Sequence, residues 1–100
     1  MKGKIIALIY FIVFTSSFLF SQRILSGKVM DEHNNPIPLA KVFVKNSAEL
    51  RTVCDVNGYY EMQLLPGEYF LVVTSVGYED REVYIGMNEY DQTKNINLIP

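Results

Sequence analysis

The sequence contains a single cysteine, Cys54, so no disulfide can form within one chain. A small exported domain without disulfides depends for its stability on the packing of its apolar side chains. Cys54 follows the β-favouring residues 51–53 and directly precedes a turn-forming segment. We therefore expect a buried, inert thiol, with a disulfide between two chains as the alternative.

The sequence also contains a single histidine, His33. Catalytic zinc needs about three protein ligands and an open position, and His33 has no second imidazole or thiolate near it in the sequence. His33 stands in a polar loop, where we expect it to be solvated. Residues 54–78 form the central segment of expected strands and turns. They contain no cluster of nucleophilic, basic or metal-binding side chains. The sequence thus predicts neither an enzyme nor a bound cofactor or metal.

The first 21 residues have the three-part layout of a secretory signal peptide. A basic head, MKGK, precedes the uninterrupted apolar run of residues 5–14, and small polar residues then lead towards Gln22. The run is short for a membrane span of about 20 residues, and a membrane anchor is the alternative interpretation. We predict cleavage after Ser21 and a single domain over residues 22–100.

The net charge of residues 22–100 argues against two classes of binding partner. Loss of residues 1–21 removes Lys2 and Lys4 and leaves 7 basic against 11 acidic side chains, a formal charge of −4. An acidic exported domain is a poor candidate for binding nucleic acid or an anionic membrane surface. The remaining 79 residues suffice for one small core. We expect this part of the chain to span no membrane and to bind no nucleic acid.

Apolar and polar residues alternate through the central part of the chain. Tyr60, Met62 and Leu64 fall on one side of an expected strand, and residues 69–73 resume the alternation after a turn at residues 66–67. The turn is Pro-Gly, in which proline fixes φ and glycine permits a reversal. This period of two is typical of strands that bury one face.

Similar patterns extend over the rest of the chain. Strands are expected at residues 24–30, 39–45, 50–54, 59–64, 68–75, 81–85 and 93–99, with turn signals about every ten residues. No segment has helical periodicity. Two packed sheets are the natural solution for such short strands. The sequence thus predicts an all-β fold, a seven-stranded antiparallel β-sandwich, with a small barrel as the alternative.

One turn has the composition of an ion site. Asp55 and Asn57 stand two residues apart before Gly58, so both could offer oxygens to calcium. The further ligands and distal glutamate of an EF-hand are missing, and the same residues are good turn formers. We predict a turn rather than an ion site.

Three apolar side chains fall on the outward sides of their strands: Phe43, Phe70 and Val72. Scattered surface hydrophobes are ordinary in small domains. The functional hypothesis is an interaction patch for a neighbouring domain or partner. The tyrosines could similarly stack on sugars, although tyrosine is common in sandwich strands; the candidates are Tyr59, Tyr78, Tyr84 and Tyr90.

Four segments together carry a family resemblance: GKVMD (27–31), PIPLAKV (36–42), CDVNGYY (54–60) and LPGEYFL (65–71) running on to GY (77–78). In this order and spacing they resemble the carboxypeptidase-regulatory-like domain, a seven-stranded, transthyretin-like Greek-key sandwich. The resemblance covers essentially all of residues 23–99. Cys54 departs from the pattern, because the family more often has a hydroxyl residue there.

The resemblance implies a place in the cell and a role. Such domains commonly follow the signal peptide of TonB-dependent outer-membrane receptors of Gram-negative bacteria, including the SusC type that imports glycans. We therefore expect an exported, non-catalytic accessory module in the periplasm or outer membrane, whose partners are the receptor plug and barrel or other envelope proteins. The alternative is a free-standing secreted adhesion or carbohydrate-binding sandwich with a glycan as its ligand.

Overall fold

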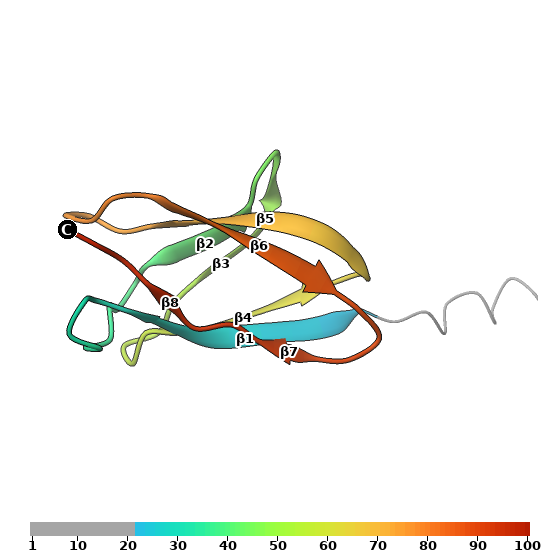
Figure 1. The fold of residues 1–100 in the computed structure, drawn as a ribbon, viewed down its shortest axis with the longest axis horizontal. Helices are drawn as coiled ribbons and strands as arrows, with labels where there is room; N and C mark the ends of the chain where they lie inside the picture. The colour runs from blue at the N-terminus through green and yellow to red at the C-terminus, as the bar shows by residue number, and fades with distance from the viewer. Residues whose placement is uncertain (1–21) are drawn as a thin grey trace, which may run out of the picture.

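The computed structural model describes residues 22–100, which form two packed sheets with no helix (Figure 1). The predicted signal peptide, residues 1–21, lies outside the described residues. The strands are β1 (Arg23–Met30), β2 (Lys41–Val44), β3 (Ser47–Val53), β4 (Tyr59–Leu64), β5 (Gly67–Thr74), β6 (Arg81–Met87), β7 (Gln92–Thr93) and β8 (Ile96–Asn97). One sheet has the order β4-β1-β7, with β8 also pairing with β1, and the other has the order β3-β2-β5-β6. The predicted all-β sandwich is confirmed.

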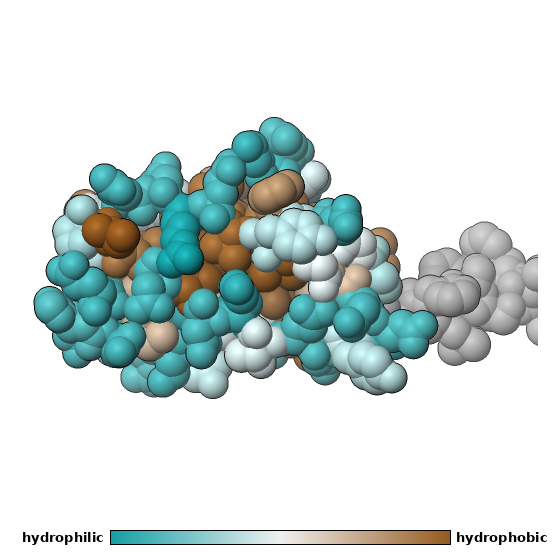
Figure 2. Space-filling view, viewed as in Figure 1, coloured by the Kyte–Doolittle hydropathy of each residue, from teal (hydrophilic) through white to brown (hydrophobic). Residues whose placement is uncertain are grey.

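The core lies between the sheets and follows from the alternation of the sequence. On β4, Tyr60, Met62 and Leu64 are buried while the intervening residues are exposed. Leu71 and Val73 of β5 face them from the other sheet and are fully buried. Figure 2 shows part of this apolar layer from the side, between the two sheets. β4 and β5 thus place one face in the core and leave the other more exposed to solvent.

The turns also form largely as predicted. The Asp55 carboxylate accepts the backbone N–H groups of Asn57 at 2.9 Å and Tyr59 at 3.0 Å, and Gly58 follows with a φ of 75°. The Leu65–Gly67 turn has a role that its composition does not reveal. It joins β4 in one sheet to β5 in the other, so it passes between the layers instead of closing a hairpin.

Several strands differ from the predicted bounds: β2 is shorter, Lys41–Val44, and β6 extends to Met87. β3 begins at Ser47, three residues before the expected start. The expected final strand is divided into β7 and β8, which both pair with β1 in parallel, so the fold has eight strands instead of seven. The side chains of Asp91 and Asn95 accept the N–H groups of Ile24 and Lys28. Asn95 lies between β7 and β8, so its side chain takes the place of a main-chain acceptor where the final strand is interrupted, whereas Asp91 does so just before β7.

The division between β7 and β8 is held by a close contact with β1. Lys94 donates its N–H to Ser26, and its carbonyl accepts the hydroxyl of the buried Tyr60 at 2.5 Å. Gly27 lies beneath this carbonyl, and a methyl group there would come within 2.7 Å of the Lys94 carbonyl carbon. Only glycine therefore permits the chain to approach β1 so closely at this point.

Candidate functional site

The three residues of the predicted patch are brought together on the outer face of the β3-β2-β5-β6 sheet. Phe43 of β2 lies directly opposite Val72 of β5, and Phe70 is two residues before Val72 on the same face. Phe70 is 52% exposed, while Phe43 and Val72 are half-buried. The strand register thus joins side chains that are far apart in sequence into one apolar surface.

Two further residues enlarge this surface, which we call the outer-face patch. Tyr84 of β6 lies opposite Phe70, and the two rings meet edge to face with centroids 5.7 Å apart. Val53, on β3, is more than half exposed and lines a hollow of about 410 Å³ together with Phe43. Both were missed as members of an apolar surface, because only the cross-strand register shows that they adjoin Phe43 and Phe70.

Charged groups border the outer-face patch. Lys45 and Glu82 form a 2.7 Å ion pair across the sheet, with about half of each side chain exposed. The Tyr84 hydroxyl donates to Glu68 at 3.1 Å, and this hydrogen bond to the carboxylate raises the pKa of Tyr84. An apolar centre within a polar border is the usual composition of a protein-binding surface.

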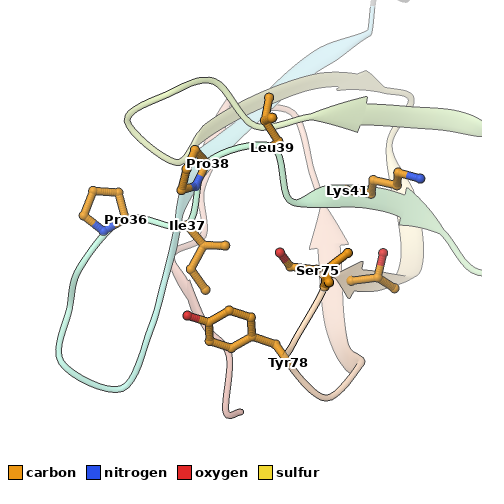
Figure 3. A pocket seen from close by; sticks show the side chains of 9 residues that line it. Pro36, Ile37, Pro38, Leu39, Lys41, Ser75 and Tyr78 are labelled. Carbon is orange, nitrogen blue, oxygen red and sulfur yellow. The ribbon is translucent and has the colours of Figure 1, made fainter.

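A second concave surface lies at one end of the sandwich, where the loop before β2 faces the loop after β5 (Figure 3). Its volume is about 620 Å³, and Ile37 and Tyr78 lie side by side in it. Leu39 and Val76 on its border are 68% and 99% exposed. Leu39 has a φ of 63°, which is rare for a bulky residue. The end pocket is thus made mainly of loop residues, and Lys41, Thr74 and Ser75 add polar groups to its apolar lining.

Comparison with known proteins identifies the family. The family model of the CarboxypepD_reg-like domain matches residues 25–100. The chain belongs to this family. It is 38% identical over 80 residues to the TonB-dependent receptor P39 of Formosa agariphila, a match that covers 80% of this chain and 8% of the receptor. The chain thus spans less than a tenth of the length of that curated relative.

Solved structures with this fold have diverse functions. The CarboxypepD_reg-like domain superimposes on a chain of a type II cohesin–X-dockerin complex from Acetivibrio cellulolyticus with a TM-score of 0.65 and 21% identity, covering 76% of this chain and 56% of that one. It also matches catechol 1,2-dioxygenase of Acinetobacter radioresistens with a TM-score of 0.64 and 15% identity, covering 80% and 52%. These likenesses show the fold alone.

The reactive side chains of this CarboxypepD_reg-like domain are buried, hydrogen-bonded to the backbone or exposed on the surface. Cys54 is buried as a free thiol, as predicted, and burial raises its pKa to about 11. Asp31 binds backbone N–H groups as Asp55 does, and the hydrogen bond from Asn35 is the largest cause that lowers its pKa. His33 is exposed beside Glu32 at 3.6 Å. Among residues 22–100, no three histidine, cysteine or acidic side chains gather as metal ligands would.

The four candidate sugar-stacking tyrosines are distributed over separate elements. Tyr84 belongs to the outer-face patch, Tyr78 lines the end pocket, and the Tyr59 ring lies 5.4 Å from the Lys28 ammonium. Tyr90 lies in the loop between β6 and β7. In the part of the chain that the structure describes, no helix is long and apolar enough to cross a membrane.

Proposed function

We propose that this chain is a non-catalytic, exported accessory module and forms the N-terminal domain of a TonB-dependent outer-membrane receptor. The observation that carries the proposal is the 38% identity to the receptor P39 over four fifths of the chain. The match covers 8% of that receptor, which is the share expected of a small module beside a much larger transport unit. We place the module in the envelope of a Gram-negative bacterium, at the periplasm or outer membrane.

The engagement of the reactive groups supports a non-catalytic role. The Cys54 thiol is buried with a raised pKa, which disfavours the thiolate that acts as a nucleophile. The carboxylates of Asp31 and Asp55 accept backbone N–H groups and shape their own loops. These side chains stabilise the fold. Each would have to leave its buried or hydrogen-bonded position before it could act on a substrate.

The outer-face patch is the surface that we assign to docking. It combines Phe43, Phe70 and Val72 with Tyr84 and Val53 on one sheet face. We propose that this face binds the plug or barrel of the receptor, or another envelope protein. Burial of aromatic side chains at the centre of an interface commonly contributes much of the binding free energy.

The reading frame beyond codon 100 provides the first test. A continuous frame that encodes a plug and long alternating barrel strands supports the receptor assignment. A stop codon followed by an unrelated gene refutes it and favours the free-standing adhesion or carbohydrate-binding module, which binding to a glycan array would then detect.

Docking is tested with Phe70→Ser in the full chain against the separately expressed remainder of the receptor. We expect at least a tenfold loss of affinity, because Phe70 lies at the centre of the outer-face patch. Val56→Ser is the matched control, since Val56 is an exposed apolar residue in the turn before β4. Equal affinity of the two variants would refute docking through this face.

A further inference from the structure

The free edge of β6 is a second surface with a defined chemistry. β6 ends the sheet order β3-β2-β5-β6, so no strand of residues 22–100 pairs with its outer side. Its register with β5 runs from Arg81 to Met87 without a shift. The opposite edge strand, β3, has an irregular register against β2. A long, regular and unpaired edge strand is a template for the addition of another strand.

One hydrogen bond shows which residues of β6 direct their main-chain N–H and C=O groups towards the free edge. The Gln92 side chain in β7 donates to the carbonyl of Gly86 at 2.7 Å, so Gly86 directs its main-chain groups away from β5. Main-chain direction alternates along a strand. Glu82 and Tyr84 therefore present their N–H and C=O groups to the same free side.

The core side chains of this strand are not completely covered. Val83, Ile85 and Met87 are 8%, 5% and 5% exposed, whereas Leu71 and Val73 of the adjacent β5 are fully buried. Figure 2 shows apolar surface between the two sheets on the side where β6 and β8 lie in Figure 1. A strand added beside β6 would cover these side chains if its own inward residues were apolar.

Side chains bridge the gap to the other sheet only near the ends of β6. The Arg81 guanidinium donates to the Asn97 carbonyl at 2.6 Å at one end, and the Gln92 amide binds Gly86 at the other. Between these two bridges, within residues 22–100, no hydrogen bond joins β6 to β7 or β8. The open stretch therefore runs over Glu82–Ile85, the middle of the strand.

Charge indicates the sequence of the missing strand. Glu79 and Asp80 precede β6 and Glu89 and Asp91 follow it, whereas Glu82 within the strand is paired with Lys45 at 2.7 Å. The one basic residue among them, Arg81, already donates to the Asn97 carbonyl. An extended segment with basic outward residues complements this edge. A second copy of the chain would instead bring two acidic edges together.

We propose that the β6 edge binds an extended basic segment of another protein as an added strand. The segment has apolar residues at alternate positions over Val83 and Ile85 and lysine or arginine towards its ends, near the carboxylates of Asp80 and Glu89 that flank β6. Its main chain bonds the N–H and C=O groups of Glu82 and Tyr84. This site adjoins the outer-face patch at Glu82 and Tyr84 but uses their main-chain groups and not their side chains, and its test does not depend on the receptor assignment.

The test uses the full chain and two synthetic peptides, KVTVKVT and its acidic counterpart EVTVEVT. We expect the basic peptide to bind at least tenfold more tightly, with an affinity that falls as salt is added. Backbone hydrogen exchange measured by NMR should slow at Glu82 and Tyr84 when the basic peptide is bound. Equal binding of the two peptides, no binding of either, or protection at β3 instead would overturn the proposal.

Two variants separate the edge from a general charge effect. The double variant Asp80→Lys, Glu89→Lys should reverse the preference between the peptides, whereas Glu61→Lys, on the exposed face of β4, should leave it unchanged. Tyr84→Pro should abolish binding, because it removes an N–H group that faces the free edge and not β5. Thermal unfolding of each variant verifies folding. Dimerisation that protects Glu82 and Tyr84 without peptide would identify a second copy as the occupant and overturn the proposal.

Discussion

The close approach at Gly27 gives a sharp prediction about stability. Replacing Gly27 by alanine places a methyl group within 2.7 Å of the Lys94 carbonyl carbon and 3.0 Å of the Tyr60 ring. The backbone at Lys94 must then move away from β1, because its carbonyl is not the end of a flexible side chain. This movement disrupts the hydrogen bond from Tyr60 and the bond from Lys94 to Ser26.

The magnitude follows from two opposing effects. Overpacking of a tight site costs about 1–3 kcal/mol. Alanine in place of glycine recovers about 0.4–1 kcal/mol by restricting the unfolded chain. With the lost hydrogen bonds, we expect Gly27→Ala to lower the free energy of unfolding by about 2 kcal/mol. This is a large fraction of the about 4–12 kcal/mol expected for a domain of this size, and it lowers Tm by about 8–16 °C.

Gly86→Ala provides the matched control, because Gly86 is also a strand glycine. A methyl group there would lie 3.4 Å from the Tyr84 hydroxyl, an ordinary contact. We expect a stability equal to or up to about 1 kcal/mol above that of the unchanged chain. Urea unfolding followed by circular dichroism measures both variants. If Gly27→Ala and Gly86→Ala have the same midpoint, the inferred contact between Gly27 and Lys94 is wrong.

Three other outcomes are expected. Tyr60→Phe should lower stability by about 1–2 kcal/mol in urea unfolding, and an unchanged midpoint would contradict the bond to Lys94. Cys54 should resist iodoacetamide at pH 8 until urea unfolds the chain. The pKa of the Cys54 thiol rises from 9.0 to about 11 on folding, so the contribution of this thiol to the free energy of unfolding is complete below pH 9 and is lost as the pH rises towards 11. Rapid alkylation of the folded chain would refute the burial of this thiol. Asp55→Ala should cost about 1 kcal/mol, and calcium should leave the Tm of the unchanged chain the same; a calcium-dependent Tm would show an ion site instead.

The parts of the fold that could be predicted are those set by neighbouring residues. The buried set on β4, Tyr60, Met62 and Leu64, follows directly from a period of two. The turn at residues 65–67 was also evident, but not that it connects different sheets. That outcome depends on which strands pair, and pairing is decided by contacts between distant residues.

The end of the chain shows the same limit. Residues 93–99 alternate well enough to predict one strand, yet Asn95 binds β1 through its side chain and divides it. The parallel direction of β7 and β8 is likewise a property of the assembled sheet. No local pattern in the sequence distinguishes it from the antiparallel arrangement that was predicted.

The outer-face patch could be predicted only in part. The outward positions of Phe43, Phe70 and Val72 follow from alternation within β2 and β5. The inclusion of Tyr84 depends on its register opposite Phe70, which the sequence does not specify. In the sequence Tyr84 is a candidate for sugar stacking, because its position in the chain gives no indication that the Phe70 ring lies beside it.

The parallel pairing of β1 with β7 and β8 has a mechanical consequence. Residue 23 begins β1 at one end of the sandwich, and the chain leaves β8 towards the opposite end (Figure 1). Tension applied to the two ends would pull these strands lengthwise past each other. The hydrogen bonds between them would then share the load instead of opening one after another like a zip. A force along the long axis would therefore load these hydrogen bonds in shear.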